Sequence, residues 1–345
     1  MRTIFLSILL ISIILTAKTQ TIGGNSIYNF LKLPATPQLT GLGGVNISNI
    51  SNDIGLSFNN PALLRPSMHA QLTTVFNSMY AGIKNYHAMM GYTSEELQTS
   101  FSLGTEYFDY GTIAQTDASG NVFGTFRPGD YVVQISGSRK YLERWYYGAT
   151  IKFIHSNYGL YRSDGLAMDV GVAYYDSTSL LQVSVLIKNM GVQLKRYEGT
   201  PSDDLPFDIQ AGITKRLKNA PLQFSLTAQR LHQFNIRYND TSFNNDNGFN
   251  QTSEAAITFD KIFRHIVIAT QVYVGDKLEI TAAYNHLRRA ELNIYNATNG
   301  LNGFSLGVGV LFKKIQIRYA RAYYQNNTAY NQFGLNLSLN EFSAL

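Results

Sequence analysis

The residues whose types and spacing could support catalysis are few, and each lacks the partners that catalysis needs. Gly303-Phe304-Ser305-Leu306-Gly307 matches the G-x-S-x-G pattern of nucleophilic serines. That chemistry requires a sharp turn from a strand into a helix, with a histidine and an acid nearby. Here apolar and small residues alternate without a break through Phe312, so the pattern predicts a strand with Ser305 on its polar face. We expect no enzymatic activity.

Metal and cofactor chemistry finds equally little support. The chain has no cysteine, and its six histidines include no pair four residues apart and no His-Glu-x-x-His. Gly41-Leu42-Gly43-Gly44 lacks the Lys-Ser/Thr end of a phosphate loop. Residues 117–121 and 244–248 carry oxygen ligands, but neither segment has the spacing or closing glutamate of an EF-hand. We predict no catalytic residue, no metal and no cofactor.

The composition excludes several classes of protein. Hydrophobic residues make up 45% of the 345 residues and charged residues 15%, against roughly 25% charged in ordinary soluble chains. The 23 tyrosines and 20 phenylalanines stand against a single tryptophan. A net charge of +5 is too mild for a nucleic-acid-binding surface. These values argue against a disordered chain or a disulfide-stapled module, and they suit a β-structure that faces lipid.

The first residues predict export. Met1-Arg2 precedes an apolar run that ends at Leu15, and small residues follow at Ala17. A basic start, an apolar run and a small-residue exit are typical of a cleaved signal peptide, here over residues 1–19. A membrane anchor is the alternative, but the run is shorter than the roughly 20 residues that a spanning helix needs.

Alternation with a period of two runs through most of the remaining chain. Phe304, Leu306, Val308 and Val310 alternate with small residues, and other segments repeat this pattern. The predicted strands cover residues 70–80, 83–93, 97–108, 130–141, 145–157, 165–176, 180–192, 205–218, 221–234, 265–274, 277–288, 303–312, 315–324 and 328–339. About fourteen strands of this length predict an all-β fold, a transmembrane antiparallel β-barrel over residues 70–345.

The connections support a barrel in the outer membrane. Long links near 109–129, 157–164, 193–204, 235–264 and 289–302 alternate with short turns, as in outer-membrane barrels with long external loops. Aromatic residues gather near strand ends, where membrane girdles form. A soluble periplasmic β-protein is the alternative. We expect Arg288-Arg289 to face outside, where they could meet lipopolysaccharide phosphates or simply be solvated.

The segment before the first strand predicts a plug. Residues 20–69 carry several glycines and prolines, and apolar residues such as Phe30, Leu31, Leu39 and Leu63 that favour burial. A segment of this length must lie in the lumen or in the periplasm. We predict a plug (hatch) that contains the element Asn60-Pro61-Ala62.

Several motifs resemble one known family. They are Gly24 to Pro34, Leu42-Gly43-Gly44, Ile47-Ser48, Asp53, Asn60 to Leu64, Tyr107 to Gly111, Asp117 to Gly120, Gly124-Thr125-Phe126, Asp130-Tyr131 and Lys152 to Ser156. Together they resemble the PorQ family, which consists of outer-membrane components of the type IX secretion system and is related in architecture to the FadL-like and PorV-like barrels. Asn60-Pro61-Ala62 is similar to an element of that group's plug.

The resemblance implies a non-enzymatic role in protein secretion. A PorQ-like barrel would anchor a PorZ-like surface protein beside a PorU/PorV-like pair, in the attachment complex that processes secreted cargo and joins it to lipopolysaccharide. We expect the loops near 109–129 and 235–264 to present the docking surface, because long loops often carry function. The alternative is a FadL-like channel for small hydrophobic molecules. A channel predicts an apolar pocket and a mobile plug, whereas an anchor predicts a blocked lumen.

Overall fold

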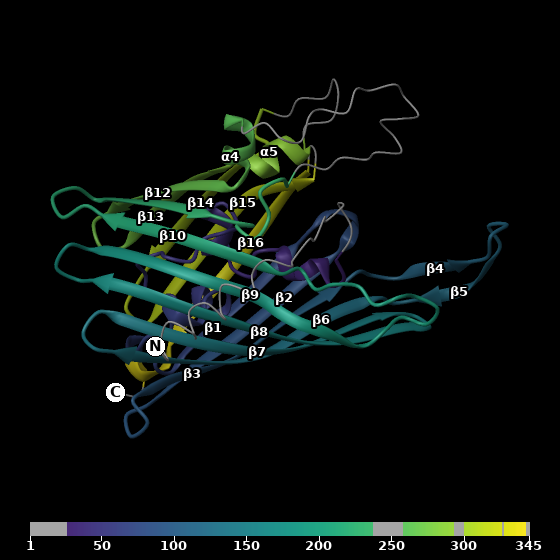
Figure 1. Ribbon diagram of the computed structural model, residues 1–345, viewed down its shortest axis with the longest axis horizontal. Helices are drawn as coiled ribbons and strands as arrows, with labels where there is room; N and C mark the ends of the chain where they lie inside the picture. Colours follow the sequence, from purple (N-terminus) through teal and green to yellow (C-terminus); the bar gives the residue numbers. More distant parts are fainter. Residues whose placement is uncertain (1–25, 237–257, 293–299, 326–327, 343–345) are drawn as a thin grey trace, which may run out of the picture.

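The computed structural model describes residues 26–236, 258–292, 300–325 and 328–342. Fourteen antiparallel strands close into a barrel, with β1 paired to β16 (Figure 1). The strands are β1 (Gln71–Ser78), β2 (Lys84–Ser94), β3 (Thr99–Asp109), β6 (Gly129–Tyr141), β7 (Trp145–Tyr158), β8 (Tyr161–Asp176), β9 (Leu181–Lys195), β10 (Asp208–Arg216), β11 (Leu222–Ala228), β12 (Ile266–Val274), β13 (Leu278–Asn285), β14 (Phe304–Leu311), β15 (Ile315–Gln325) and β16 (Thr328–Ser338). The predicted fold class is confirmed.

The wall follows the predicted alternation. In β14, Phe304, Leu306 and Val308 point outward and are exposed, whereas Ser305 is buried on the inner face. Successive strand residues point to opposite faces, so one face of each strand can meet lipid while the other lines the lumen. Among the described residues, no helix is long and apolar enough to cross a membrane.

The two sides of the barrel differ in height. Strands β6 to β9, the tall side, contain 13, 14, 16 and 15 residues. Strands β10 to β14, the low side, contain 9, 7, 9, 8 and 8 residues. A tilted strand needs about 9–11 residues to cross a membrane. The tall side therefore extends beyond the span that a membrane requires (Figure 1).

Two long connections differ from their prediction. The link predicted near 157–164 is a two-residue turn, because Tyr158 pairs with Tyr161 and Gly159 takes a positive φ of 73°. The link near 109–129 contains a two-stranded hairpin, β4 (Ile113–Thr116) and β5 (Val122–Phe126), which projects from the tall side. Local cross-strand pairing thus continues where the sequence shows no apolar alternation.

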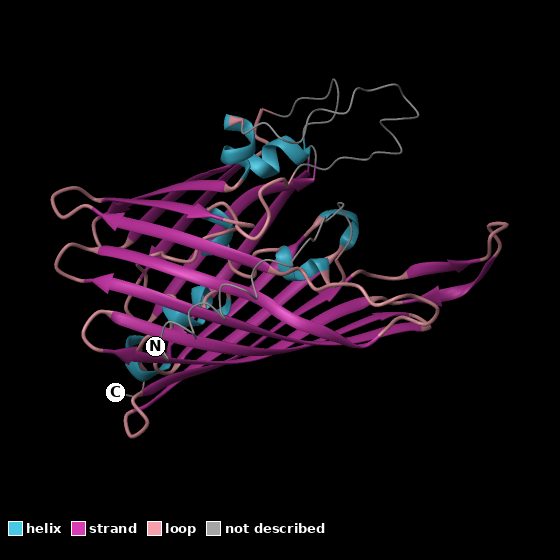
Figure 2. Cartoon of the chain, in the orientation of Figure 1, coloured by secondary structure: helices cyan, strands magenta, loops and turns pink. Residues whose placement is uncertain are grey.

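Helices occupy the lumen and the ends of the barrel (Figure 2). At the end of the low side, α4 (Phe259–Arg264) precedes β12 and α5 (His286–Leu292) follows β13. Short elements lie in the segment before β1, namely η2 (Asn29–Lys32), α2 (Pro37–Gly41), η3 (Ile54–Phe58), η4 (Pro61–Leu63) and η5 (Pro66–Met68). The remaining two are η6 (Tyr80–Gly82) and η7 (Leu339–Glu341).

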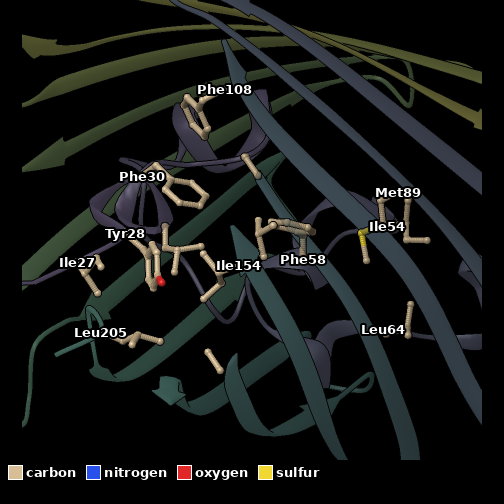
Figure 3. Close-up of a cluster of buried hydrophobic side chains, with 14 of the residues drawn as sticks. Ile27, Tyr28, Phe30, Ile54, Phe58, Leu64, Met89, Phe108, Ile154 and Leu205 are labelled. Atoms are coloured by element: carbon tan, nitrogen blue, oxygen red, sulfur yellow. The ribbon is translucent and has the colours of Figure 1, made fainter. Parts of the chain in front are cut away.

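Residues 26–70 run through the lumen from one end to the other, and we call them the plug segment. Near its start, Ile27 N donates to Asp204 O at 3.0 Å, in the long connection between β9 and β10. At its end, Ala70 N donates to Gly91 O at 2.9 Å, near the short turn after β2. Phe30 packs edge-on against Phe108 of the wall at 5.5 Å between ring centroids (Figure 3). The hydrophobic core therefore lies inside the barrel, between the plug segment and the wall.

Candidate functional site

The element Asn60-Pro61-Ala62 forms a capped turn against the barrel wall. The Asn60 side chain caps η4, since its Oδ1 accepts from Ala62 N at 3.0 Å and its Nδ2 donates to Ile47 O at 2.8 Å. Pro61 occupies the first position, where a helix has no use for the missing N–H. All three residues are buried. The side chain of Asn60 thus joins two parts of the plug segment.

The wall beside this element is shaped by two glycines. Gly148 of β7 and Gly171 of β8 lie opposite each other in the ladder. A Cβ on Gly148 would lie 2.7 Å from the carbonyl carbon of Pro61, and a Cβ on Gly171 would overlap Asn60 Oδ1. Any larger side chain would push the plug segment away from the wall. The same close approach occurs at Gly165 against Tyr28, Gly212 against Ile47 and Gly334 against Pro37.

Hydrogen bonds attach the plug segment to strands around the circumference. Tyr28 Oη and Ser163 Oγ are 2.6 Å apart, and Thr40 Oγ1 donates to Gln332 Oε1 at 2.6 Å. Asn49 Nδ2 donates to Gln271 Oε1 at 2.5 Å. These contacts reach β8, β16 and β12, so the plug segment is held from several directions.

An ion pair joins the plug segment to β15. Arg318 Nη1 donates to Asp53 Oδ2 at 2.7 Å, and both side chains are buried. Asp53 Oδ1 accepts from Gly55 N at 2.8 Å, which caps η3, and from Asn336 Nδ2 at 3.1 Å. Arg318 Nη2 also lies 3.9 Å from Glu279 Oε2. These three hydrogen bonds satisfy both carboxylate oxygens of Asp53 and hold its side chain in place.

A second group of charges lies on the tall side. Lys152 Nζ lies 2.5 Å from Asp169 Oδ2 and donates to Asn189 Oδ1 at 2.9 Å. Between β8 and β9 the register shifts at Asp169, so that Lys188 and Asn189 oppose one residue, as in a β-bulge. Lys188 Nζ then donates to Asn59 Oδ1 of the plug segment at 2.5 Å. The bulge therefore places a wall cation against the plug segment.

A small cavity lies between these charges and the plug segment. Its plug side is largely apolar and its wall side carries Glu106, Gln134, Lys152 and Lys188. Only about 20 Å³ of it accepts the centre of a water molecule. That is room for one or two waters, since each needs at least 10–15 Å³ on this measure. Gln134 Oε1 is buried and has no hydrogen-bond partner among the described residues, which is consistent with a water there.

The prediction that Arg288 faces the outside of the barrel is wrong. Arg288 lies in α5, is buried and points inward, where it donates to Gly43 O at 2.6 Å, to Tyr324 Oη at 2.8 Å and to Ser305 Oγ at 3.1 Å. Strand β13 ends at Asn285, and the helical turn that follows redirects the side chain toward the plug segment. Ser305 is the lumenal strand residue that its alternation predicts.

The suspected docking loops are only partly described. In the 109–129 loop, Asp117 Oδ1 accepts from Ser119 N at 2.9 Å and from Asn121 N at 2.8 Å, and Asp117 Oδ2 accepts from Asn121 Nδ2 at 2.9 Å. These bonds, that from the Asn121 side chain foremost, lower the pKa of Asp117 and close the turn on itself. Much of the 235–264 loop, residues 244–248 and the signal-peptide prediction lie outside the described residues.

Sequence reasoning missed the buried charges of the lumen. Lys152 shares the inward face of its strand with Gly148 and Thr150, so a lysine at an inward position was an available signal. Its partner Asp169 could not be assigned, because the pairing depends on the register between β7 and β8. Among the described residues, no group of three or more potential metal ligands comes together.

Comparisons with known proteins support the fold. No family model matches the chain, and no curated protein is similar to it. The chain is similar to the Ralstonia pickettii toluene transporter TbuX, with 10% identity and a TM-score of 0.51 over 89% of this chain and 98% of that chain. It is similar to the CymD monoaromatic hydrocarbon channel, with 10% identity and a TM-score of 0.50 over 90% and 97%. A Pseudomonas aeruginosa FadL homologue matches with 12% identity and a TM-score of 0.44 over 88% and 97%.

At these identities the likeness shows the fold alone. The described residues form a closed antiparallel barrel of fourteen strands, a fold similar to that of this toluene transporter and this hydrocarbon channel. This fold fits an outer-membrane location.

Proposed function

We propose that this chain is a plugged barrel in the outer membrane of a Gram-negative cell that anchors a protein assembly at the cell surface. The observation that carries the proposal is the attachment of the plug segment to the wall. Buried hydrogen bonds, the Asp53–Arg318 pair and the close contact at Gly148 hold it in place. The cavity beside it has room for little more than water. A lumen filled in this way suits a barrel that anchors a surface protein better than one that passes small molecules.

The finer assignment rests on the resemblance to the PorQ family. The proposed role is in the type IX secretion system, where this barrel would hold a PorZ-like protein beside a PorU/PorV-like pair. The hairpin β4–β5 supports a docking role, because it stands clear of the wall and exposes Val122 and Phe123 at 65% and 69%. The proposal includes export with a cleaved signal peptide at residues 1–19.

An affinity experiment tests the anchor. The tagged chain is recovered from outer membranes in mild detergent, beside a variant in which a short Gly-Ser turn replaces residues 112–126. We expect a large soluble surface protein and a sortase-like protease with the unmodified chain, and neither with the variant. A barrel recovered alone, or one carrying extracted lipid or hydrocarbon, would contradict the proposal.

The second candidate is a FadL-like channel for small hydrophobic molecules. The names of the two fold neighbours, a toluene transporter and a monoaromatic hydrocarbon channel, favour it. So does the apolar plug side of the cavity, which includes Leu31, Leu33, Leu39 and Phe58. Since both functions share a fold, fold alone does not separate them.

Uptake of radiolabelled toluene separates the two candidates. Cells that produce the chain are compared with cells that lack it, at equal levels of outer-membrane protein. An anchor with a filled lumen predicts equal uptake. Faster uptake with the chain would favour the channel and count against the anchor.

A further inference from the structure

The low side is short for a membrane wall. Its strands of 7–9 residues would span roughly 18–23 Å at a rise of about 3.3 Å and a tilt of about 40°. The apolar band of an outer-membrane barrel is about 25 Å tall. Something else must therefore complete the apolar belt where these strands end.

Helix α4 stands at this edge (Figure 1). Phe259, Ile262 and Phe263 are exposed at 82%, 43% and 46%. Their spacing of i, i+3 and i+4 puts all three on one face of the helix. Lys261 is only 4% exposed. A helix at a water-facing surface shows the reverse arrangement, with its apolar face toward the core.

A row of rings joins this face to the outer surface of the wall. Phe304 and Tyr284 are cross-strand partners on the outward faces of β14 and β13, with ring centroids 5.0 Å apart. The Tyr284 ring lies 6.0 Å from His286, and His286 lies 6.2 Å from Phe263. A row of ring contacts therefore connects the outer surface of the wall with Phe263 of α4.

Hydrogen bonds hold α4 in this position. Tyr284 Oη and His286 Nδ1 are 2.9 Å apart, and His286 Nε2 lies 3.0 Å from Asp260 Oδ1. Asp260 Oδ2 accepts from Arg264 Nε at 2.9 Å. The helix is thus tied to the end of β13 through its polar residues, and within the described part of the chain its three apolar side chains stay exposed.

We propose that α4 contacts lipid at the membrane interface and extends the apolar belt of the low side. The occupant of the Phe259–Ile262–Phe263 face is lipid, because this face continues the lipid-facing surface of β13 and β14. Aromatic side chains are favoured at this depth, where one end is apolar and the other polar. A short amphipathic helix in the interface buries such a face among the head groups and upper acyl chains. The inference is independent of whether the barrel anchors a protein or passes a hydrocarbon.

Quenching by brominated lipid tests this contact. The chain has one tryptophan, so Trp145→Phe provides a background for Phe263→Trp. The matched control is Phe123→Trp, on the hairpin that projects from the tall side. Both are placed in bilayers of a phosphatidylcholine brominated near the head group, and heat-dependent gel mobility confirms that each variant is folded. We expect at least a ~2-fold loss of Phe263→Trp emission, with the control unaffected.

Equal quenching of the two tryptophans would overturn the proposal. The emission wavelength of Phe263→Trp would then show what surrounds this side chain. Unquenched, red-shifted emission from Phe263→Trp would mean that α4 faces water. Unquenched, blue-shifted emission would mean that protein covers the face.

Discussion

The tall and low sides of the barrel differ in height but hold the same plug segment by similar means. On the tall side, backbone meets backbone at Gly148, and Lys188 reaches Asn59 from a bulge. On the low side, a Cβ on Gly41 of the plug segment would lie 3.3 Å from the Gly307 backbone of β14, and Ser48 Oγ lies 2.9 Å from Thr214 Oγ1. The comparison teaches that wall height and plug attachment are separate features. Both sides attach the plug segment, but only the tall side extends beyond the membrane span.

Different elements lie at the ends of the strands on the two sides. The tall side extends its ladders and carries the β4–β5 hairpin, whereas the low side stops early and is followed by α4 and α5. In α5, Arg288 donates to Gly43 O and so connects this end of the low side to the plug segment. Three substitutions and one loop replacement can break or sharpen this comparison.

The largest effect is expected at the buried pair of the tall side. Lys152→Met removes the cation and leaves Asp169 charged and buried, which costs about 3–5 kcal/mol of unfolding free energy. Urea unfolding in detergent micelles measures this loss of unfolding free energy. The double variant Lys152→Met/Asp169→Leu removes both charges and should recover much of the loss. A double variant no more stable than the single one would mean that the pair acts through something other than its charges.

The next effect is expected where the wall touches Pro61. Gly148→Val places a side chain within 2.7 Å of plug backbone and should cost about 3 kcal/mol by overpacking. Gly137→Val, on neighbouring β6, is the matched control, since its Cβ would meet Phe101 at an ordinary 3.7 Å. The temperature at which each variant loses its folded gel mobility gives the comparison. Equal temperatures would show that the plug segment can move away from the wall freely.

A smaller effect is expected at the low side. Arg288→Met removes three hydrogen bonds from a charged donor and should cost about 2 kcal/mol. Arg289→Met is the neighbouring control, since its two bonds, to Gly300 O and Asn302 O, are both 3.3 Å long. Limited proteolysis of the plug segment provides the readout. If both variants are cleaved at the same rate, Arg288 does not hold the plug segment.

The smallest effect on stability is expected at the hairpin. Replacing residues 112–126 with a short turn should change the unfolding free energy by less than about 0.5 kcal/mol, because the hairpin lies outside the barrel ladder. Urea unfolding again measures the change. A large loss of unfolding free energy would mean that the stability of the tall side depends on the β4–β5 hairpin.

The sequence alone determined the barrel wall. Alternation such as that from Phe304 to Leu311 depends only on neighbouring residues, because a strand with one lipid face and one lumenal face must repeat every two residues. The short turns and the number of barrel strands follow from the same local pattern. The alternation of Phe333 and Leu335 likewise predicted the last strand, which closes the barrel against β1.

Only the tertiary structure decided which inward residues meet. Asp53 and Arg318 are 265 positions apart, and their contact exists because β1 pairs with β16 and the plug segment crosses the lumen. Lys152 meets Asp169 only in one register, since a slip of one residue turns every side chain to the opposite face. Arg288 occupied the end of a predicted strand, and the turn into α5 carried it inward. Local pattern fixes which face a residue takes, whereas closure and register fix its partner.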